Sequence, residues 1–171
     1  MMEEEEIVYR NEREMYPYVK SWLERMLRDK FRNKTVTVAN TSRKILSKWL
    51  FEQGYHRYFK DYQTYEIEVD ITGILEEEEE RADLIFVECK LGKITLRDLS
   101  QLLGYSKVAN PFLSFIISPK GISDSMNLLL TIYRRHDILY YSPNRFITVG
   151  RWDEEKRELD PSSIIPRGAY I

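Results

Sequence analysis

The run DLIFVECK at 83–90 places a carboxylate and an ammonium group, Glu88 and Lys90, at the end of a continuous apolar stretch. Side chains alternate along a β-strand, so Glu88 and Lys90 share one face of a strand that the fold would bury. A salt pair at a solvated strand end is the commoner explanation of such a motif. The chemical alternative is that both groups hold a cation and a water molecule against a substrate, which requires partners elsewhere in the chain.

A second carboxylate reaches Glu88 if the preceding segment pairs with this strand. Residues 64–75 alternate apolar and acidic side chains, as a half-buried strand does, and the acidic run 76–80 predicts an exposed turn. Opposed residues of an antiparallel hairpin have a constant numerical sum; opposing Asp70 to Glu88 makes that sum 158 and centres the turn at 79, inside the acidic run. Two carboxylates about 5 Å apart across a ladder repel each other unless one is protonated or a cation lies between them. Such hard oxygen ligands suit Mg²⁺.

Other residues of this region have weaker signals. Gln101 and Tyr105 are four residues apart on a predicted helix, so they share a face and lie in reach of one ligand. Asp83 has the opposite parity to Glu88 and faces away from it. The single cysteine excludes a zinc or iron–sulfur site built from cysteines, and neither His56 nor His136 has a partner at ligand spacing, so we expect a surface or stacking role for each.

The net charge of −2 conceals a strong asymmetry along the chain. Residues 25–60 contain ten Lys or Arg against two acidic residues, a local charge of +8. Such a segment can lie against a phosphate backbone, and Arg43, Lys44 and Lys48 are its candidates for that contact. A solvated helical face is an equally good explanation of the same charges.

The pattern of apolar residues predicts one α/β domain spanning 1–171, with a mixed central sheet flanked by helices. We expect Pro17 to delay the start of the first helix to near Tyr16, Thr41 or Ser42 to cap the second, and Gly54 to end it. The expected helices are 12–31, 41–54, 95–108 and 122–136. The expected strands are 35–38, 64–75, 84–90, 112–118, 138–141 and 145–150.

Several classes of protein are disfavoured by the sequence. No stretch approaches the roughly 18 consecutive apolar residues of a membrane span. The start of the chain is acidic where a secretory signal would be basic and then apolar. We therefore expect a soluble cytoplasmic protein with no membrane partner.

Taken together, Asp70, the motif Glu88-Cys89-Lys90 and the QLLGY element at 101–105 resemble the PD-(D/E)xK nuclease superfamily. The last element is similar to the QxxxY motif of its RecB-like branch. The segment EREMYPYVKSWL at 12–23 resembles the opening helix of archaeal Holliday junction resolvases and Mrr-like restriction endonucleases. The chain departs from the superfamily pattern in having no proline before Asp70, and it lacks the four cysteines of the iron–sulfur RecB-like nucleases.

The resemblance implies a restriction-endonuclease-like core that hydrolyses DNA phosphodiester bonds by attack of a metal-activated water. Mg²⁺, with Mn²⁺ as an expected substitute, would be held by Asp70, Glu88 and the backbone carbonyl of Cys89. Lys90 would act on the water, and Glu12 would be an auxiliary acidic residue of the catalytic set. The resemblance also assigns Gln101 and Tyr105 to substrate binding.

Residues 32–60 stand as a basic insertion relative to simpler members of that superfamily, and we expect it to dock DNA. The alternative is a catalytically silent module that binds nucleic acid or acts as a scaffold on the same fold. The sequence leaves open whether the enzyme would be an endo- or an exonuclease, and whether the chain forms a homodimer.

Overall fold

The helices and strands form in the order that the sequence predicts, and the computed structural model describes them over residues 9–169. The strands are β1 Thr35–Asn40, β2 Ile71–Glu77, β3 Arg81–Cys89, β4 Leu113–Ser118, β5 Tyr140–Ser142, β6 Arg145–Asp153 and β7 Glu158–Leu159. The α-helices are α1 Tyr16–Lys30, α2 Leu46–Glu52, α3 Leu96–Ala109 and α4 Asp124–Asn127. As expected, α1 begins at Tyr16, with Pro17 in its first turn.

The strands form one mixed seven-stranded sheet in the order β1-β2-β3-β4-β6-β5, with β7 also paired to β6. The first three are antiparallel, β3, β4 and β6 are parallel, and β5 is antiparallel to β6. α3 connects the parallel pair β3 and β4, as a crossover connection must. The predicted α/β class with a mixed sheet is therefore confirmed.

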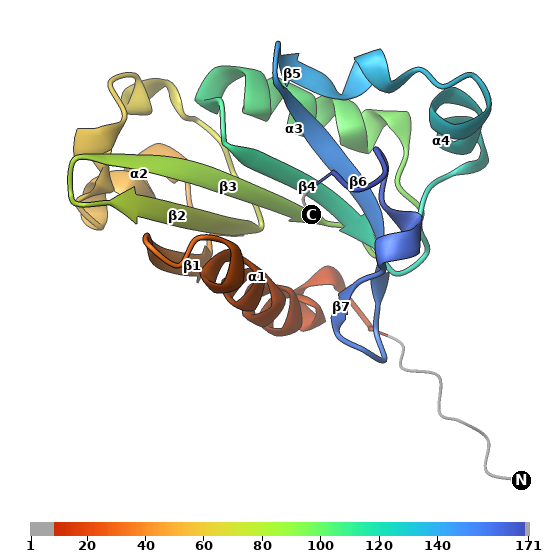
Figure 1. Cartoon of the computed structure of the whole chain (residues 1–171), viewed down its shortest axis with the longest axis horizontal. Helices are drawn as coiled ribbons and strands as arrows, with labels where there is room; N and C mark the ends of the chain where they lie inside the picture. The colour runs from red at the N-terminus through yellow and green to blue at the C-terminus, as the bar shows by residue number, and fades with distance from the viewer. Residues whose placement is uncertain (1–8, 170–171) are drawn as a thin grey trace, which may run out of the picture.

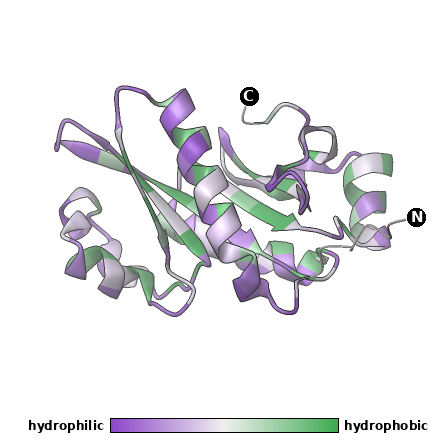
Figure 2. Ribbon diagram, turned by 90° about the horizontal axis from the view of Figure 1, so that it is seen from below, coloured by the Kyte–Doolittle hydropathy of each residue, from purple (hydrophilic) through white to green (hydrophobic). Residues whose placement is uncertain are grey.

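Helices cover both faces of the sheet, with α1 on one side and α2 and α3 on the other (Figure 1). Hydrophobic residues concentrate along the central strands (Figure 2). On β2 and β3, Ile71 and Val87 pack under α1, whereas Ile74 and Phe86 pack under α2 and α3. Glu88 has the parity of Phe86, so its side chain leaves the sheet on the side of α3.

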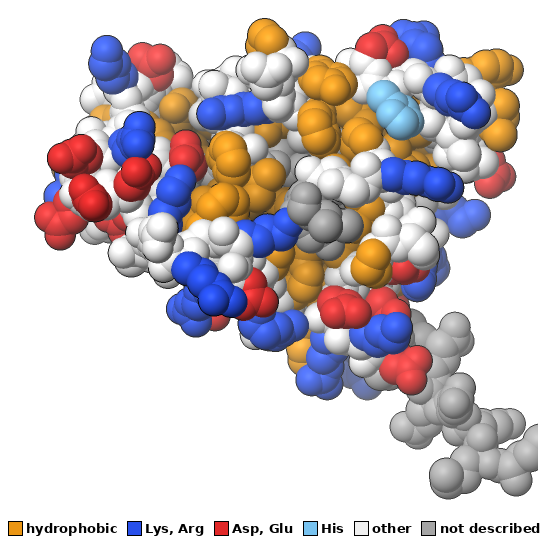
Figure 3. Space-filling model, in the orientation of Figure 1, with side chains coloured by type: hydrophobic (Ala, Val, Ile, Leu, Met, Phe, Trp, Pro, Cys, Tyr) orange, Lys and Arg blue, Asp and Glu red, His pale blue; other side chains and the backbone are white. Residues whose placement is uncertain are grey.

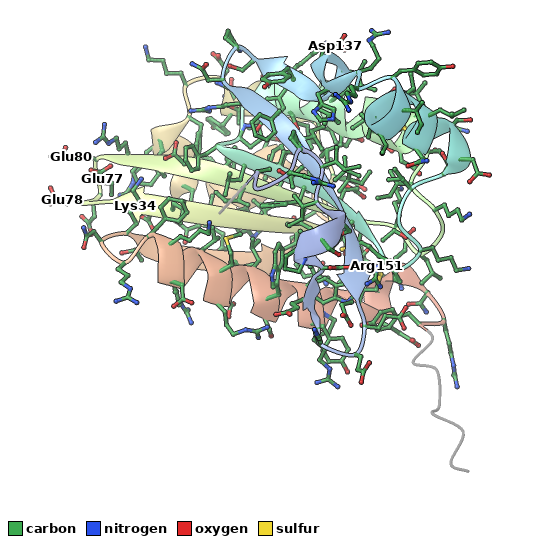
Figure 4. All side chains as sticks on the ribbon, turned by 45° about the vertical axis from the view of Figure 1, so that its right-hand side comes forward. Lys34, Glu77, Glu78, Glu80, Asp137 and Arg151 are labelled. Carbon is green, nitrogen blue, oxygen red and sulfur yellow. The ribbon has the colours of Figure 1, made fainter. Side chains whose placement is uncertain are left out.

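The hairpin of β2 and β3 has the predicted register. Ile71 pairs with Val87 and Glu77 with Arg81, so opposed residues sum to 158. The turn lies at Glu78 and Glu79, whose φ angles of 51° and 60° are left-handed. Acidic side chains gather at this end of the molecule, and Figure 4 marks several of them beside Lys34 (Figures 3 and 4). The glutamate run is the exposed turn that the sequence predicts.

The predicted strand before this turn is shorter than expected. Residues 65–69 keep the predicted alternation of buried and exposed side chains but form no strand. The carbonyls of Tyr65 and Ile67 instead accept hydrogen bonds from the first two amides of α2, at 3.1 and 2.8 Å. These bonds occupy carbonyls that a strand partner would need. β2 therefore begins at Ile71, and Asp70 lies at the bend before it.

The predicted cap of α2 is wrong, because neither Thr41 nor Ser42 caps this helix. The Thr41 hydroxyl is buried 2.6 Å from the carbonyl oxygen of Val69 and 2.7 Å from the hydroxyl of Thr72. Thr41 thus ties the loop after β1 to the start of β2. Gly54 does end the helical region, with a left-handed φ of 78° that suits glycine.

The C-terminal third differs in detail from the prediction. The helix expected at 122–136 is α4 followed by a π-helical turn, Leu128–Ile132. The strand expected at 138–141 begins only at Tyr140, because His136–Leu139 is a 3-10 turn. Across residues 9–169, no helix is both long enough and apolar enough to cross a membrane.

Candidate active site

Asp70 and Glu88 meet at the open end of the hairpin. The last pair of the ladder is Ile71 with Val87, so the next position outward sets Asp70 beside Glu88, as the register predicts. The two carboxyl groups are close enough to be hydrogen-bonded to each other. The bend before β2 therefore keeps the pairing that the sequence predicts, although Asp70 itself lies outside the strand.

Asp70 is fixed by two donors from different elements. The Tyr16 hydroxyl, at the start of α1, donates to its Oδ1 at 2.8 Å, and the Cys89 amide donates to its Oδ2 at 2.8 Å. The carboxyl group is only 8% exposed, so both bonds are shielded from water. Each carboxylate oxygen has a second lone pair, which leaves Asp70 able to bind a cation. Sequence reasoning did not identify Tyr16, because its role depends on how α1 packs.

Replacing Tyr16 with phenylalanine is expected to lower the free energy of unfolding by about 1–3 kcal/mol, because Asp70 would lose a buried hydrogen bond to a charged group. Urea unfolding measures the change. The matched control is Tyr133→Phe. Because Tyr133 is 68% exposed, removing its hydroxyl should change the free energy of unfolding little. Equal unfolding midpoints for parent and Tyr16→Phe would show that the Tyr16 bond does not hold Asp70.

The pKa of Glu88 is raised to about 10, first by burial, then by the charge of Asp70 and by the hydrogen bond to it. Lys90 opposes this rise, and Glu12 adds to it. Without a cation, Glu88 therefore keeps its proton at neutral pH. A divalent cation placed between the two groups would displace that proton, because metal ligands must be deprotonated.

Lys90 lies beside this pair and keeps its charge. Its Nζ is 3.7 Å from Oδ1 of Asp98, and its side chain is 22% exposed. Burial by itself lowers the pKa of Lys90, but the negative charges of Glu88, Asp98 and Glu12 outweigh burial and raise it. The ammonium group is therefore a hydrogen-bond donor and a positive charge, and it is a poor proton acceptor at neutral pH. Asp98 also completes the predicted capping box of α3 with Thr95.

Glu12 approaches the same region from the α1 side of the sheet. It lies in the 3-10 turn Glu12–Glu14 and lines a cavity of about 620 Å³ together with Tyr16 and Leu91. Burial raises the pKa of Glu12, Lys90 lowers it, and the charge of Asp70 raises it further. Glu12 is thus close enough to act electrostatically on the carboxyl pair.

α3 brings Gln101 and Tyr105 to the carboxyl pair. Nε2 of Gln101 donates to the Tyr105 hydroxyl at 3.0 Å. Both side chains line a cavity of about 680 Å³ that Asp70 and Glu88 also line. With Lys48 of α2, five of the residues selected from the sequence therefore line one cavity, from α2, β3, α3 and the bend before β2.

Six further residues that line this cavity were not assigned to a site from the sequence: Ser42, Ile45, Ser47, Gln63, Glu66 and Glu68. The signal for the two glutamates was present, since Glu66 and Glu68 occupy the outward positions of the alternating segment before β2. With these residues, the cavity wall is strongly acidic.

A cation at this site would rely on few protein ligands. Among residues 9–169, no group of three or more His, Cys, Asp or Glu side chains is placed to hold a metal ion. The carbonyl of Cys89 lies on the side of Asp70, because the N–H and C=O of one strand residue point the same way and this N–H donates to Asp70. Two carboxyl groups and this carbonyl fit Mg²⁺, which binds through one or two carboxylates and keeps several waters.

The basic segment does not form one surface. The sheet separates the cations of α1 from those near α2. Lys34 pairs with Glu77 and Asp83, and Arg57 pairs with Glu76. The cations of residues 25–60 are therefore divided between the two faces of the sheet, and DNA docking by residues 32–60 stays a prediction.

Three cations of the segment line the cavity of the carboxyl pair or cavities that share Ser42 with it. Arg43 and Lys44 line a cavity of about 410 Å³, and Arg43 also lines the cavity of Glu12. Lys48 lines the cavity of Asp70. Within residues 9–169, none of these three cations forms an ion pair. They form a basic rim at one side of an acidic cavity.

Fold and site together define an α/β protein whose mixed sheet carries a carboxyl pair in an open cavity and a charged lysine near that pair. No protein-family model matches the sequence, and no curated protein or solved structure matches it either. The resemblance to PD-(D/E)xK nucleases stays a prediction from the motif residues.

Proposed function

We propose that the protein is a Mg²⁺-dependent deoxyribonuclease on a restriction-endonuclease-like core. The observation that carries the proposal is that Asp70 and Glu88 line one cavity, with Lys90 close enough to act electrostatically on both. Separately, each residue has a structural explanation. Together they bury two carboxyl groups against each other, which opposes ionisation of the pair unless a cation binds.

Each residue of the site has a separate role in the proposed hydrolysis. Mg²⁺, when bound, would neutralise charge on the scissile phosphate and make a water molecule a better nucleophile. Asp70 and Glu88 hold that position, and Tyr16 fixes Asp70. Lys90 donates hydrogen bonds to the attacking water or to the charge that develops on phosphorus, held in place by Asp98. The water oxygen bonds to phosphorus and gives a proton to the surrounding solvent, while the bond from phosphorus to the leaving sugar oxygen breaks and that oxygen takes up a proton from solvent.

DNA has to be held by groups outside the acidic cavity. The rim of Arg43, Lys44 and Lys48 offers phosphate contacts beside the carboxyl pair. Phosphate contacts of this kind position a strand without reading its sequence. Gln101 and Tyr105, which line the same cavity as the carboxyl pair, would contact the nucleotide at the scissile phosphate.

Replacing Arg43, Lys44 and Lys48 together with glutamine is expected to weaken DNA binding and to flatten its salt dependence. Each lost phosphate contact reduces the slope of log affinity against log salt by about 0.9 on duplex DNA. Fluorescence anisotropy across a salt series measures that slope, and the cleavage rate at saturating DNA should persist.

The matched control for the basic rim removes the same charge from the other face of the sheet. It replaces three exposed residues of the same basic segment, Arg25, Arg28 and Arg32, with glutamine. Equal slopes for the two triple variants would mean that net charge alone governs binding, and the rim would lose its assigned role.

Cleavage itself is tested with supercoiled plasmid, a linear duplex and a single-stranded oligonucleotide, each with Mg²⁺, with Mn²⁺ and with EDTA. The proposal expects cleavage of at least one substrate that depends on the divalent cation. Binding without cleavage of any substrate, under every metal condition, would contradict it and leave a catalytically silent DNA-binding module.

A further inference from the structure

A second, smaller cavity adjoins the carboxylate cavity. Its volume is about 300 Å³, and α2 and the 3-10 turn Tyr62–Thr64 form its walls. Ser47, Lys48 and Gln63 line both this cavity and the one that contains Asp70. A molecule that fills the carboxylate cavity can therefore extend into the smaller one past these three residues.

Two aromatic rings flank the smaller cavity. Phe51, on α2, is 60% exposed, although burial of such a side chain is favourable. The rings of Phe51 and Tyr62 are nearly parallel, at 15°, with centroids 6.5 Å apart. This separation is at the wide end of the range of about 4.5–7 Å for aromatic pairs. The two rings are therefore oriented alike without lying in close stacking contact.

His56 completes the group. Its ring centroid is 4.7 Å from that of Phe51 and 5.3 Å from that of Tyr62. Its Nδ1 is buried and has no hydrogen-bond partner among residues 9–169. Buried polar atoms without a partner are rare in native proteins, and each one calls for a cause such as an absent ligand. The aromatic group of Phe51, His56 and Tyr62 thus combines exposed ring surface with an unused polar atom.

We infer that the aromatic group stacks an unpaired nucleobase of the DNA strand whose phosphate lies at Asp70 and Glu88; the inference rests on the proposed nuclease function. A flat base has the shape that a ring face accepts, and every base has a π-face. Lys48 lies between the two cavities, where the sugar–phosphate chain of that nucleotide would pass.

The inference names a substrate class. Bases of an intact duplex are stacked on each other and cannot reach a protein ring without being unpaired. A single strand, or a duplex end or branch with an unpaired base, offers the base freely. The protein should therefore prefer DNA with unpaired bases beside the scissile phosphate.

The test compares parent, Phe51→Ala and Phe51→Trp on a single-stranded oligonucleotide and on a duplex of the same length. Phe51→Ala should weaken single-strand binding about 5-fold or more, the lower end of base–aromatic stacking measured by alanine substitution, and leave duplex binding within about 2-fold. Phe51→Trp, which keeps a ring, should bind as the parent does. Anisotropy gives the affinities, and single-turnover cleavage is measured in the same samples.

A second measurement reports stacking directly. The base 2-aminopurine fluoresces less when it stacks, so an oligonucleotide series that carries it at successive positions should show one quenched position in the parent. That quenching should be absent in Phe51→Ala. The matched control is Tyr133→Ala, because Tyr133 is also highly exposed but follows the helical segment of α4, at the end of the molecule opposite α2 (Figure 1).

The outcomes separate this inference from the proposed function. A parent that cleaves DNA while Phe51→Ala binds single strands unchanged, or loses single-strand and duplex affinity equally, overturns the inference and leaves the nuclease proposal standing. A parent that binds DNA but never cleaves it overturns the nuclease proposal. In that case a loss of single-strand affinity, without loss of duplex affinity, in Phe51→Ala still supports the stacking site, and its absence overturns that site as well. A parent that binds no DNA overturns both.

Discussion

Glu88→Gln is expected to abolish binding of Mg²⁺ and Mn²⁺ and to abolish cleavage, while the protein stays folded and at least as stable as the parent. Glutamine removes one of two carboxylate ligands, and a single carboxylate is a weak site for a hard cation. It also keeps the uncharged state that Glu88 already has without a cation. Calorimetric titration with each metal measures the affinity, and urea unfolding measures the stability.

The stability of the metal-free protein is also expected to depend on pH in a direction that Glu88 sets. The pKa of Glu88 is raised to about 10 by burial and by Asp70, so between the ordinary glutamate pKa and this value the folded state holds a proton that the unfolded state has lost. Stability of the metal-free parent therefore falls as pH rises from about 5 to 9. Glu88→Gln should remove this fall. Added Mg²⁺ should stabilise the parent and have little effect on the variant.

Two comparisons make the test specific to the pair. Glu66→Gln removes an exposed carboxylate from the wall of the same cavity and should keep metal affinity within a few fold. Asp70→Asn should lose the metal and also stability, because its amide NH₂ would face one of the two donors that Asp70 accepts from. Unchanged affinity for Mg²⁺ in Glu88→Gln would show that the carboxyl pair is not the metal site.

Local sequence signals were sufficient for the hairpin and for the residues that it brings together. The glutamate run cannot be buried, so it indicates the turn, and the register that opposes Asp70 to Glu88 centres the turn inside that run, as the structure does. The spacing of Gln101 and Tyr105 on α3 likewise needs only helix geometry. Each of these inferences involves one turn or one helix.

Features that depend on packing between distant elements were missed. Thr41 has a hydroxyl suited to a helix cap, but β2 offers it buried partners, which outweigh the local preference. Tyr16 reaches Asp70 across 54 residues because α1 lies under the sheet. The basic run also looked continuous only along the chain, since the sheet separates α1 from α2. No periodicity in the sequence indicates that these distant residues lie close together, or that the sheet separates the two helices.

Lys90→Ala is expected to lower the single-turnover rate of DNA cleavage by at least ~10²-fold, on the order of what a positioned proton-transfer or donor group contributes, and to leave DNA affinity within a few fold. An interaction made only in the transition state changes rate rather than ground-state binding. Lys90 is held for that role by Asp98, and its raised pKa keeps it charged. Quenched-flow cleavage and anisotropy separate the two quantities.

Arginine at position 90 should not restore the rate, because a wide, planar guanidinium cannot reproduce the point contact of an ammonium group with water. The matched control is Lys93→Ala, which removes the same charge from an exposed position three residues away and should leave the rate unchanged. If Lys90 only closed a surface salt pair with Asp98, alanine would cost roughly 0–1 kcal/mol of stability and no activity. If Lys90→Ala cleaves DNA at the parental rate, Lys90 is not catalytic, and its ion pair with Asp98 has only a structural role.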